Sequence, residues 1–543
     1  MSNCRLLAIT VIALWTAISN AVTIDISQGQ SFHKEILGNQ PRWGYWSQGY
    51  NTESLYSIRG ISQGLCADTY DWKLITGSDA DLNVTTLSFL EECLKSSALP
   101  VLTVNARGTG DWPPVAGLIA WVYTRNHDVP FLVDLAADWV TYTNQILPNY
   151  RTGDTIPGSY QAILDEITWT YPTVKPKLRD PNTPSVPVVK YWEIGNEPTV
   201  SIPVVSGGFV AGTTETSSTF NYHDRYRDIA AGMLSADPTI KVGICTVGLD
   251  PTSNPYPEQS VLTDMALKVD FIGYHHYDQL QYAWDAQSTT DLENGLNSLF
   301  ANMHTKYTMQ RNTVTAATRN AASMEYLVTE WNPFGFMPSI GEQRHRSTAM
   351  ALACADTIFN FASDNIRAAH LFGMIKDGTA TGGAKWPICY LYEAMYTRLG
   401  DTLIYQNQDT ANKTRLYATK DSSNGQISVW ALNFNNSVSK TAQVDLSNLA
   451  GSNLPYIIQR LGGTANGLWE VNSGSTEAVK WQQIQQGKTS NFSFNISMPP
   501  ASITLLVVNP AAQCEDTNPA DVNKDCFVNI KDFAAMAGNW LAD

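Results

Sequence analysis

The sequence predicts an α/β fold in which a (β/α)8 barrel is followed by an antiparallel β-sandwich and a small C-terminal tail. In roughly the first 400 residues, short apolar runs alternate with longer amphipathic stretches. This alternation is typical of a parallel sheet that is covered by helices on its faces. After Asp401, short strand-like segments are separated by Gly, Asn and Ser turns, which indicates an antiparallel sandwich. Residues 511–543 form a polar tail that contains two cysteines.

Composition narrows the class of protein. The chain has 543 residues, a hydrophobic content of 43% and a formal net charge of −15. This hydrophobic content is ample for large cores and excludes wholesale disorder. The acidic balance argues against a nucleic-acid partner or an anionic membrane surface, because both select basic surfaces. We therefore expect a globular protein that does not bind nucleic acid.

The first segment resembles an export signal. Residues 1–21 contain one early positive charge, Arg5, then the apolar stretch Leu6–Ala17 and a small-residue ending, Ser19–Ala21. This is the layout of a secretory signal peptide, and the apolar stretch is too short to span a membrane well. No later stretch reaches spanning length, so we expect a secreted, extracellular or periplasmic protein without a membrane span.

Eight strand-like runs assign residues 22–400 to the barrel, because a (β/α)8 barrel needs eight parallel strands. The runs are Gly44–Trp46, Ser57–Arg59, Val101–Asn105, Val188–Glu197, Lys241–Val247, Asp270–Tyr277, Glu325–Asn332 and His370–Ile375. The stretches with helical periodicity between them include Leu132–Leu147, Tyr222–Ala236 and Ser347–Ala362.

Residues 401–510 are assigned to the β-sandwich. Its expected strands are Arg415–Ala418, Ile427–Asn433, Ala442–Leu446, Tyr456–Gln459 and Ser502–Val508.

Two glutamates lie at the ends of predicted barrel strands, where (β/α)8 barrels carry their catalytic residues. Glu197 ends the fourth run, in Trp-Glu-Ile-Gly-Asn-Glu-Pro, and Glu330 lies near the end of the seventh, in Val-Thr-Glu-Trp-Asn. The carboxyl ends of barrel strands face the active site, so both side chains are expected at the barrel mouth. Two facing carboxylates, about 5–5.5 Å apart, are what retaining glycoside hydrolysis requires.

These motifs resemble the clan A glycoside hydrolases. In that clan an Asn-Glu pair ends strand 4, with Glu as the acid/base, and a Glu ends strand 7 as the nucleophile. The resemblance implies that Glu197 is the acid/base and Glu330 the nucleophile. It also relates Arg59 to an arginine on strand 2, and the segment His275–Tyr277 to a His-x-Tyr element on strand 6. The candidate substrate-binding residues are Asn196, Arg59, His275, Tyr277, Trp331 and Asn105.

The expected roles make chemical demands on the two carboxyls. Glu330 must stay ionised, so donors such as Arg59 and Tyr277 should hold its pKa down. Glu197 must be protonated to release the leaving oxygen, so a less polar setting should raise its pKa. The adjacent histidines His275 and His276 serve either substrate binding or a purely structural role. No histidine spacing typical of a zinc enzyme occurs, so no cofactor is expected for catalysis.

Finer motifs resemble the α-L-arabinofuranosidase-type families. They are the segments Ala67–Trp72 and Thr103–Gly110 and the order of barrel and sandwich. Pro198, however, follows the acid/base as in xylosidase-like and endoglycanase families. The expected substrate is therefore a plant- or algal-type polysaccharide, or an oligosaccharide or side chain of one. An endo-acting glycanase and a β-xylosidase stay open as alternatives, and so does a non-catalytic carbohydrate-binding scaffold.

The tail resembles one calcium loop of a dockerin. Oxygen ligands fall at loop positions 1, 3, 5, 7, 9 and 12, position 7 being a backbone carbonyl. They belong to Asp521, Asn523, Asp525, Phe527, Asn529 and Asp532. Cys526 replaces the usual glycine at position 6 and no second loop follows, so a solvated Asp/Asn turn is the alternative. The resemblance implies Ca²⁺ binding and a cohesin-like or cell-surface partner, and Cys514 and Cys526 are the pair expected to be bridged.

Overall fold

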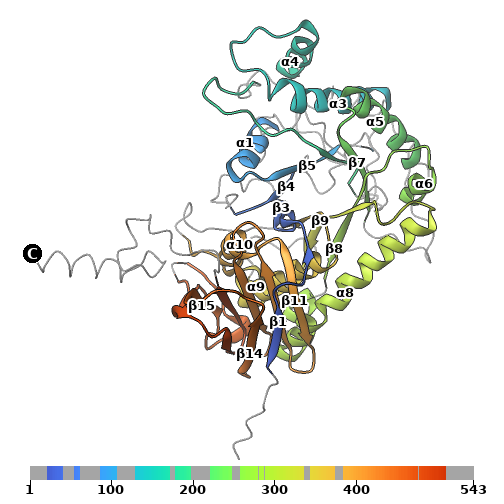
Figure 1. Ribbon diagram of the computed structural model, residues 1–543. Coiled ribbons are helices and arrows are strands. Elements are labelled where there is room, and N and C mark those ends of the chain that lie inside the picture. The colour runs from blue at the N-terminus through green and yellow to red at the C-terminus, as the bar shows by residue number, and fades with distance from the viewer. Residues whose placement is uncertain are drawn as a thin grey trace, which may run out of the picture.

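The protein is described by a computed structural model, drawn in Figure 1. The described residues are 21–40, 54–60, 86–104, 106, 129–170, 178–196, 221–246, 257–278, 280–285, 288–335, 343–372, 383–474 and 476–508. The expected signal peptide and the tail lie outside these residues, apart from Ala21.

Eight parallel strands close into a barrel in the order β10-β3-β4-β5-β6-β7-β8-β9, which confirms the predicted fold. The strands are β3 (Gly38–Gln40), β4 (Ser57–Gly60), β5 (Leu99–Val104), β6 (Tyr191–Ile194), β7 (Lys241–Thr246), β8 (Phe271–Tyr277), β9 (Glu325–Asn332) and β10 (Ala368–Phe372).

The first barrel strand differs from the prediction. The sequence predicts it at Gly44–Trp46, but the first strand is β3, and residues 44–46 lie outside the described part of the chain. All three residues of β3 are buried, although two of them are Asn39 and Gln40. A search for apolar runs overlooks this strand because its side chains are polar.

Helices cover the outside of the barrel (Figure 1). They are α1 (Thr86–Ser96), α3 (Val129–Thr141), α4 (Gly158–Thr170), α5 (Tyr222–Ala236), α6 (Pro257–Thr263), α7 (Leu280–Asp285), α8 (Thr289–Ala316), α9 (Thr348–Ser363) and α10 (Pro387–Arg398). Short helical turns are η1 (Lys34–Ile36), the π-type turn η4 (Tyr142–Ile146), η5 (Gln343–Arg346) and η7 (Gly467–Trp469). The three helices expected from periodicity are present, and Asn221 and Ser347 cap α5 and α9 by accepting from backbone N–H groups.

The sandwich consists of two sheets, with strand orders β1-β14-β17 and β16-β15-β18-β13-β12-β11-β2. Its strands are β11 (Thr402–Asp409), β12 (Thr414–Lys420), β13 (Ile427–Asn433), β14 (Lys440–Ser447), β15 (Leu454–Gly462), β16 (Gln482–Thr489), β17 (Ser493–Met498) and β18 (Ser502–Val508). The prediction missed β11, β16 and β17, whose sequences are rich in polar residues.

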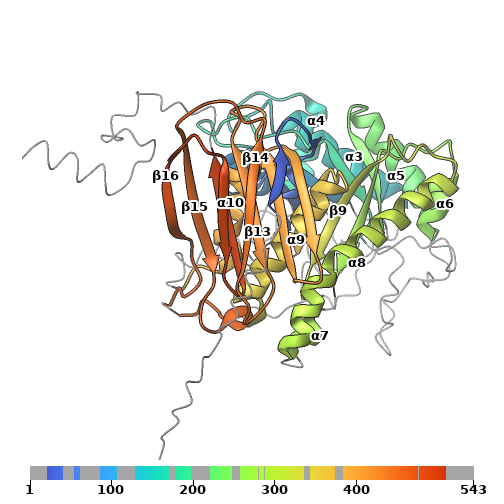
Figure 2. The ribbon, with the colours of Figure 1, turned by 60° about the horizontal axis from the view of Figure 1, so that its bottom comes forward.

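The N-terminal segment belongs to the sandwich, although the sequence analysis assigned it to the barrel. Strand β1 (Val22–Asp25) pairs with β14, and β2 (Gln30–Ser31) pairs with β11. Figure 2 shows this blue segment among the orange strands. Ile24 is fully buried in the sandwich core, so burial between the two sheets holds the segment there. From Val22 onward the chain first contributes two strands to the sandwich, then forms the barrel and then completes the sandwich.

The large sheet is buried on both faces where it meets the barrel. Along β13, Val429 and Ala431 belong to the sandwich core, whereas Trp430 and Leu432 belong to the core shared with the barrel. Tyr417 of β12 stacks on Phe359 of α9, with ring centroids 4.3 Å apart. These contacts fix the sandwich against α9, the helix that lies behind its strands in Figure 2.

A buried ion pair crosses this boundary. Asp356 of α9 accepts a hydrogen bond from the Tyr417 hydroxyl at 2.6 Å, and its carboxylate lies 3.4 Å from Nε of Arg415 on β12. Both charged side chains are fully buried. Burial raises the pKa of the Asp356 carboxyl, although Arg415 and Tyr417 oppose this effect.

Replacing Arg415 by Ala is expected to lower the free energy of unfolding by about 3–5 kcal/mol, because it leaves the Asp356 carboxylate buried without its partner. Denaturant unfolding measures the change. The double variant Arg415→Ala/Asp356→Asn is the control and should recover part of the loss. A loss below about 1 kcal/mol in the single variant would show that Asp356 is not charged in the folded protein.

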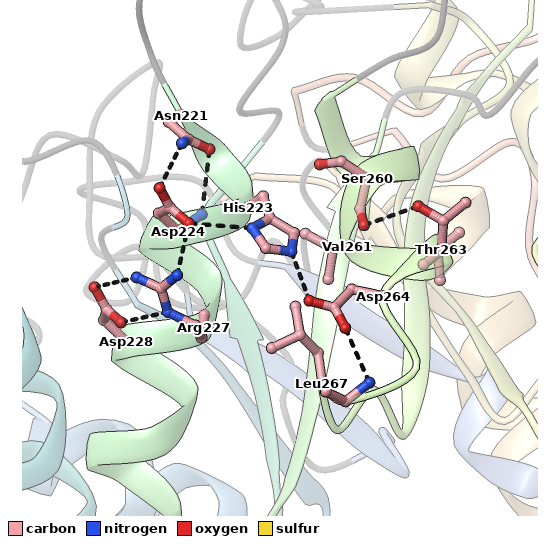
Figure 3. Close-up of polar contacts among 12 residues, drawn as sticks. Asn221, His223, Asp224, Arg227, Asp228, Ser260, Val261, Thr263, Asp264 and Leu267 are labelled. Carbon is pink, nitrogen blue, oxygen red and sulfur yellow. Dashed lines mark hydrogen bonds and ion pairs between the residues drawn. The ribbon is translucent and has the colours of Figure 1, made fainter.

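A histidine ties α5 to the segment after α6. Figure 3 shows the His223 ring between two carboxylates. Its Nδ1 lies 3.2 Å from Asp224, and its Nε2 lies 2.9 Å from Asp264. Arg319, which follows α8, donates to four backbone carbonyls between Val261 and Leu267. The His223 contacts thus join the start of α5 to the segment after α6, and Arg319 holds that segment in place.

The barrel interior changes from apolar to polar along its axis. The apolar layer at the amino ends of the strands consists of Val101, Tyr191, Phe271, Leu327 and Ala368, with Leu99 packed against it. Two residues further along β5 and β6, Thr103 and Glu193 are buried polar residues. Polar side chains thus gather at the carboxyl ends, where a barrel places its active site. Among the described residues, no helix is both long and apolar enough to cross a membrane.

Candidate active site

The barrel order places the Asn196-Glu197 strand and the Glu330 strand as predicted. In sequence order around the barrel, β6 is the fourth strand and β9 the seventh. The pairing of β8 with β9 skips Thr329, so that Tyr274 faces Val328 and His275 faces Glu330. This irregularity interrupts the side-chain alternation just before Glu330. Glu330 is 3% exposed, at the carboxyl end of the barrel.

The Glu330 carboxylate is held by four side chains from three barrel strands, β3, β4 and β8. Its Oε1 accepts hydrogen bonds from Arg59 Nη1 at 2.9 Å and from Gln40 Nε2 at 3.1 Å. Its Oε2 accepts from the Tyr277 hydroxyl at 2.5 Å and lies 3.4 Å from His275 Nδ1. The group is thereby oriented through both oxygens.

The same contacts keep Glu330 ionised. Burial by itself would raise the pKa of its carboxyl. The charges of His275 and Arg59 and the hydrogen bonds from Tyr277 and Gln40 outweigh burial, and they lower the pKa below its usual value. This confirms the expectation that Arg59 and Tyr277 hold the pKa down. A buried, oriented and ionised carboxylate is suited to nucleophilic attack.

Arg59 is the centre of the hydrogen-bond network. Its side chain is fully buried on β4. Its Nη1 donates to Glu330 Oε1 and also to Gln40 Oε1, the latter at 2.6 Å. Its Nη2 forms an ion pair with Glu193 and donates to Asn196 Oδ1 at 2.8 Å. Burial would lower the pKa of the guanidinium, but the charges of Glu193 and Glu330 outweigh burial and raise it. Arg59 therefore stays charged between two carboxylates.

The two adjacent histidines have different surroundings, because neighbouring residues of a strand point to opposite faces. His275 and Tyr277 both reach Glu330. His276 is instead bound through Nε2 to Asp278, at 3.0 Å. The contact of His276 with Asp278 fits a purely structural role. The contact of His275 with Glu330 places His275 in the candidate site.

Trp331 does not line the site. It is one of the candidate substrate-binding residues, but it is fully buried and packs edge-on against Phe361 of α9, with ring centroids 5.2 Å apart. As the next residue on the strand it points away from the barrel interior, toward the helix layer. The prediction for Trp331 is therefore wrong.

Asn196 lies in a bend that follows β6 at the carboxyl end of the barrel. Gly195 before it has φ of +80°, a conformation that favours glycine, and its N–H donates to Val104 O at 2.9 Å. Asn196 is 6% exposed and receives the Arg59 hydrogen bond. The other proposed site residues lie outside the described residues: Glu197, Asn105 and the calcium ligands Asp521, Asn523, Asp525, Phe527, Asn529 and Asp532.

Two polar residues of the site, Gln40 and Glu193, are not among those predicted from the sequence. Gln40 was missed because the first strand was placed too late in the chain. Glu193 carried a usable signal: it is an acidic residue in a buried strand, four positions before Glu197. Because side chains alternate along a strand, residues 193 and 197 are expected on the same face. Glu193 is fully buried, and its Oε2 accepts from Thr103 Oγ1 at 2.9 Å.

One group of side chains has the composition of a metal site. Glu193, Cys245 and His275 are all buried, and one ligand atom of each lies within 4.8 Å of the others. Cys245 Sγ and His275 Nε2 are 3.5 Å apart. Glu193, however, already forms an ion pair with the buried Arg59 guanidinium, so a metal cation would lie beside a fixed positive charge. The surroundings therefore fit the arginine and not a second cation.

Comparisons with known proteins support the fold. No family model and no curated protein sequence matches the chain. Among solved structures, an α-L-arabinofuranosidase from Thermotoga maritima, in complex with arabinose, is similar with a TM-score of 0.60 and 15% identity. A family 51 α-L-arabinofuranosidase from Bifidobacterium longum has a TM-score of 0.61 and 14% identity. Each match covers 90% of this chain and 99% of the other.

A xyloglucanase of glycoside hydrolase family 44 from Paenibacillus polymyxa is also similar. Its TM-score is 0.55 at 13% identity, with 90% of this chain and 99% of the other covered. The barrel followed by a sandwich is therefore an architecture that this chain shares with glycoside hydrolases.

Proposed function

We propose that the chain is a secreted retaining glycoside hydrolase that acts on plant- or algal-type polysaccharides or their side chains. The observation that carries the proposal is the setting of Glu330: it lies three strands from the Asn196-Glu197 pair and is held ionised by Arg59, Gln40 and Tyr277. The similar solved structures include arabinofuranosidases, and they support an α-L-arabinofuranosidase-like specificity.

The proposed reaction has two steps. Glu330 attacks the anomeric carbon while the Glu197 carboxyl gives its proton to the leaving oxygen, and a glycosyl-enzyme ester forms. Glu197, now a carboxylate, then removes a proton from water, which attacks the anomeric carbon and releases Glu330. Arg59 donates a hydrogen bond to Oδ1 of Asn196, so Asn196 would contact the sugar 2-hydroxyl through its NH₂ group. None of these steps requires a metal or an organic cofactor.

An endo-acting glycanase or a β-xylosidase is the second candidate. Pro198 directly after Glu197 favours it, as does the structural similarity to a xyloglucanase. A panel of aryl glycosides and neutral polysaccharides separates the candidates. Release of arabinose from α-L-arabinofuranosides supports the first, and a fall in polysaccharide viscosity with few new reducing ends supports endo action. Binding without turnover across the panel would indicate a carbohydrate-binding scaffold and contradict both.

We further propose that residues 511–543 form a dockerin-like module that binds Ca²⁺ and attaches the enzyme to a cohesin-like protein or the cell surface. Carboxylate and carbonyl oxygens at these loop spacings are the ligands that calcium prefers.

Deleting residues 511–543 is expected to leave kcat/KM unchanged and to abolish calcium binding by the full chain. None of these residues belongs to a barrel strand, and segments below about 40 residues usually need a metal or a disulfide to fold. Titration calorimetry on the full chain and on the truncated chain measures the difference. Equal calcium uptake by the two would contradict the proposed loop.

A further inference from the structure

Glu193 is a buried charge that the proposed reaction does not use. It is fully buried on β6, and burying a carboxylate costs several kcal/mol unless a partner compensates. Its Oε2 receives Arg59 and Thr103, and among the described residues its Oε1 has no hydrogen-bond partner. The carboxylate is thus held through one oxygen, and its main partner is the arginine that also holds Glu330.

The fold makes room for this carboxylate. A Cβ placed on Gly273 of β8 would lie 2.1 Å from Glu193 Oε1 and 3.0 Å from Thr329 Oγ1. The first distance is far below any real contact, so only glycine is accommodated beside Glu193 without movement. Glu193 therefore occupies a specific place in the layer beneath the site.

The guanidinium of Arg59 is divided between two anions. Nη1 meets Glu330 Oε1 at 2.9 Å and Nη2 meets Glu193 Oε2, so neither carboxylate has the bidentate geometry that is strongest for arginine. One positive charge faces two negative charges. Each carboxylate consequently receives less stabilisation from Arg59 than it would if the other were absent.

We propose that Glu193 is a positioning residue that competes with Glu330 for Arg59 and thereby keeps the nucleophile more basic than an undivided arginine would leave it. The inference rests on the proposed function, because it concerns the reactivity of Glu330. Glu193 acts only through Arg59. Its second effect is to hold Nη2 beside Asn196, so that one guanidinium orients both the nucleophile and the amide next to Glu197.

The test replaces Glu193 by Gln, which keeps the shape and removes the charge. The Glu330 carboxyl is followed in protein labelled with ¹³C at the glutamate carboxyls, and its signal is assigned by its loss in Glu330→Gln. We expect the titration midpoint of Glu330 to fall by about one pH unit, because the positive charge of Arg59 is then no longer shared with a second carboxylate. The other ionisable groups around Arg59 and Glu330 are Cys245 on β7, His275 and Tyr277 on β8, and His370 on β10.

Glu193→Asp keeps the charge but sets it one methylene back from Arg59. In this variant the titration midpoint of Glu330 should lie between its values in the wild type and in Glu193→Gln. Glu193→Asp provides the same test if Glu193→Gln does not fold. Thr103→Val is the matched control, because it removes the other donor to Glu193 Oε2 without removing a charge. In this variant the Glu330 midpoint should stay closer to the wild-type value than it does in Glu193→Gln. An unchanged midpoint in both Glu193 variants would overturn the proposal, because it would show that Glu193 is already neutral.

Kinetics give a second readout that a purely structural defect would not produce. A less basic Glu330 is a weaker nucleophile but a better leaving group. With an aryl glycoside whose second step limits turnover, Glu193→Gln should lower kcat/KM by roughly tenfold and kcat much less. Equal losses in both would overturn the proposal.

Failure of the proposed function and binding of a metal ion are two outcomes that can be told apart from failure of this inference. The NMR titration needs no substrate, so it still decides the inference if the wild type hydrolyses nothing on the panel and the proposed function fails. One tightly bound metal ion per chain that is lost in Cys245→Ser would make Glu193 a metal ligand and would overturn the proposal.

Discussion

Glu330→Gln is expected to lower glycoside hydrolysis by about 10⁴-fold or more, because it removes the charge that attacks the anomeric carbon. Gln keeps the size of the side chain, so the surrounding network should persist. In Glu330→Ala, which leaves space where the carboxylate was, azide at high concentration should restore part of the activity. The azide attacks from the face that Glu330 occupied, so the glycosyl azide formed should have inverted stereochemistry.

Glu325→Gln is the matched control for this prediction. It makes the same substitution at the other end of the same strand, where Glu325 forms an ion pair with Lys241 at 2.6 Å. Its activity should equal that of the wild type. Rates within tenfold of the wild type for Glu330→Gln, or rescue by azide with retained stereochemistry, would contradict the assignment of Glu330 as the nucleophile.

The fold could be predicted to the level of strand order because most barrel strands are apolar runs that end in polar clusters. This held for β5 to β10, and it placed β6 and β9 three positions apart in the ring. It failed for β3, whose Asn39 and Gln40 are buried by the site and not by an apolar core. Periodicity reports burial of apolar residues, so it does not detect a strand whose buried side chains are polar.

The candidate site was predictable where position alone decides function. Glu330 follows from its place at a strand end, Arg59 and Tyr277 follow from the resemblance to clan A, and the structure brings the three together. Trp331 lies next to Glu330 in the sequence but not in the site, because the next residue of a strand points to the opposite face. Gln40 and Glu193 depend on contacts between distant strands, with Gln40 lying 290 positions from Glu330 in the sequence.

The sandwich boundary was missed for a similar reason. Pairing of β1 with β14 joins residues more than 400 positions apart, and Ile24 reads in the sequence as the start of the barrel domain. Nothing in the local pattern of Val22–Asp25 distinguishes a sandwich strand from a barrel strand. Only the packing of the folded chain, in which the N-terminal strand fills the edge of the small sheet, decides between them.

Glu197→Ala is expected to reduce hydrolysis of natural glycosides by about 10²–10⁴-fold, the usual contribution of a general acid. Aryl glycosides with good leaving groups should lose much less in the first step, because their leaving oxygen needs little protonation. Their second step should still be slow, since water then lacks its general base, so the glycosyl-enzyme should accumulate. Mass spectrometry of the intact chain would detect this ester on Glu330.

Glu330→Gln is the comparison that separates the two roles of the carboxyls. It should lose activity on natural and activated substrates alike, whereas Glu197→Ala should distinguish between them. Added azide should speed turnover of activated substrates by Glu197→Ala and give a product of retained stereochemistry, because azide there replaces water in the second step. Equal losses on both substrate types in Glu197→Ala, without accumulation of the ester, would contradict its role as the acid/base.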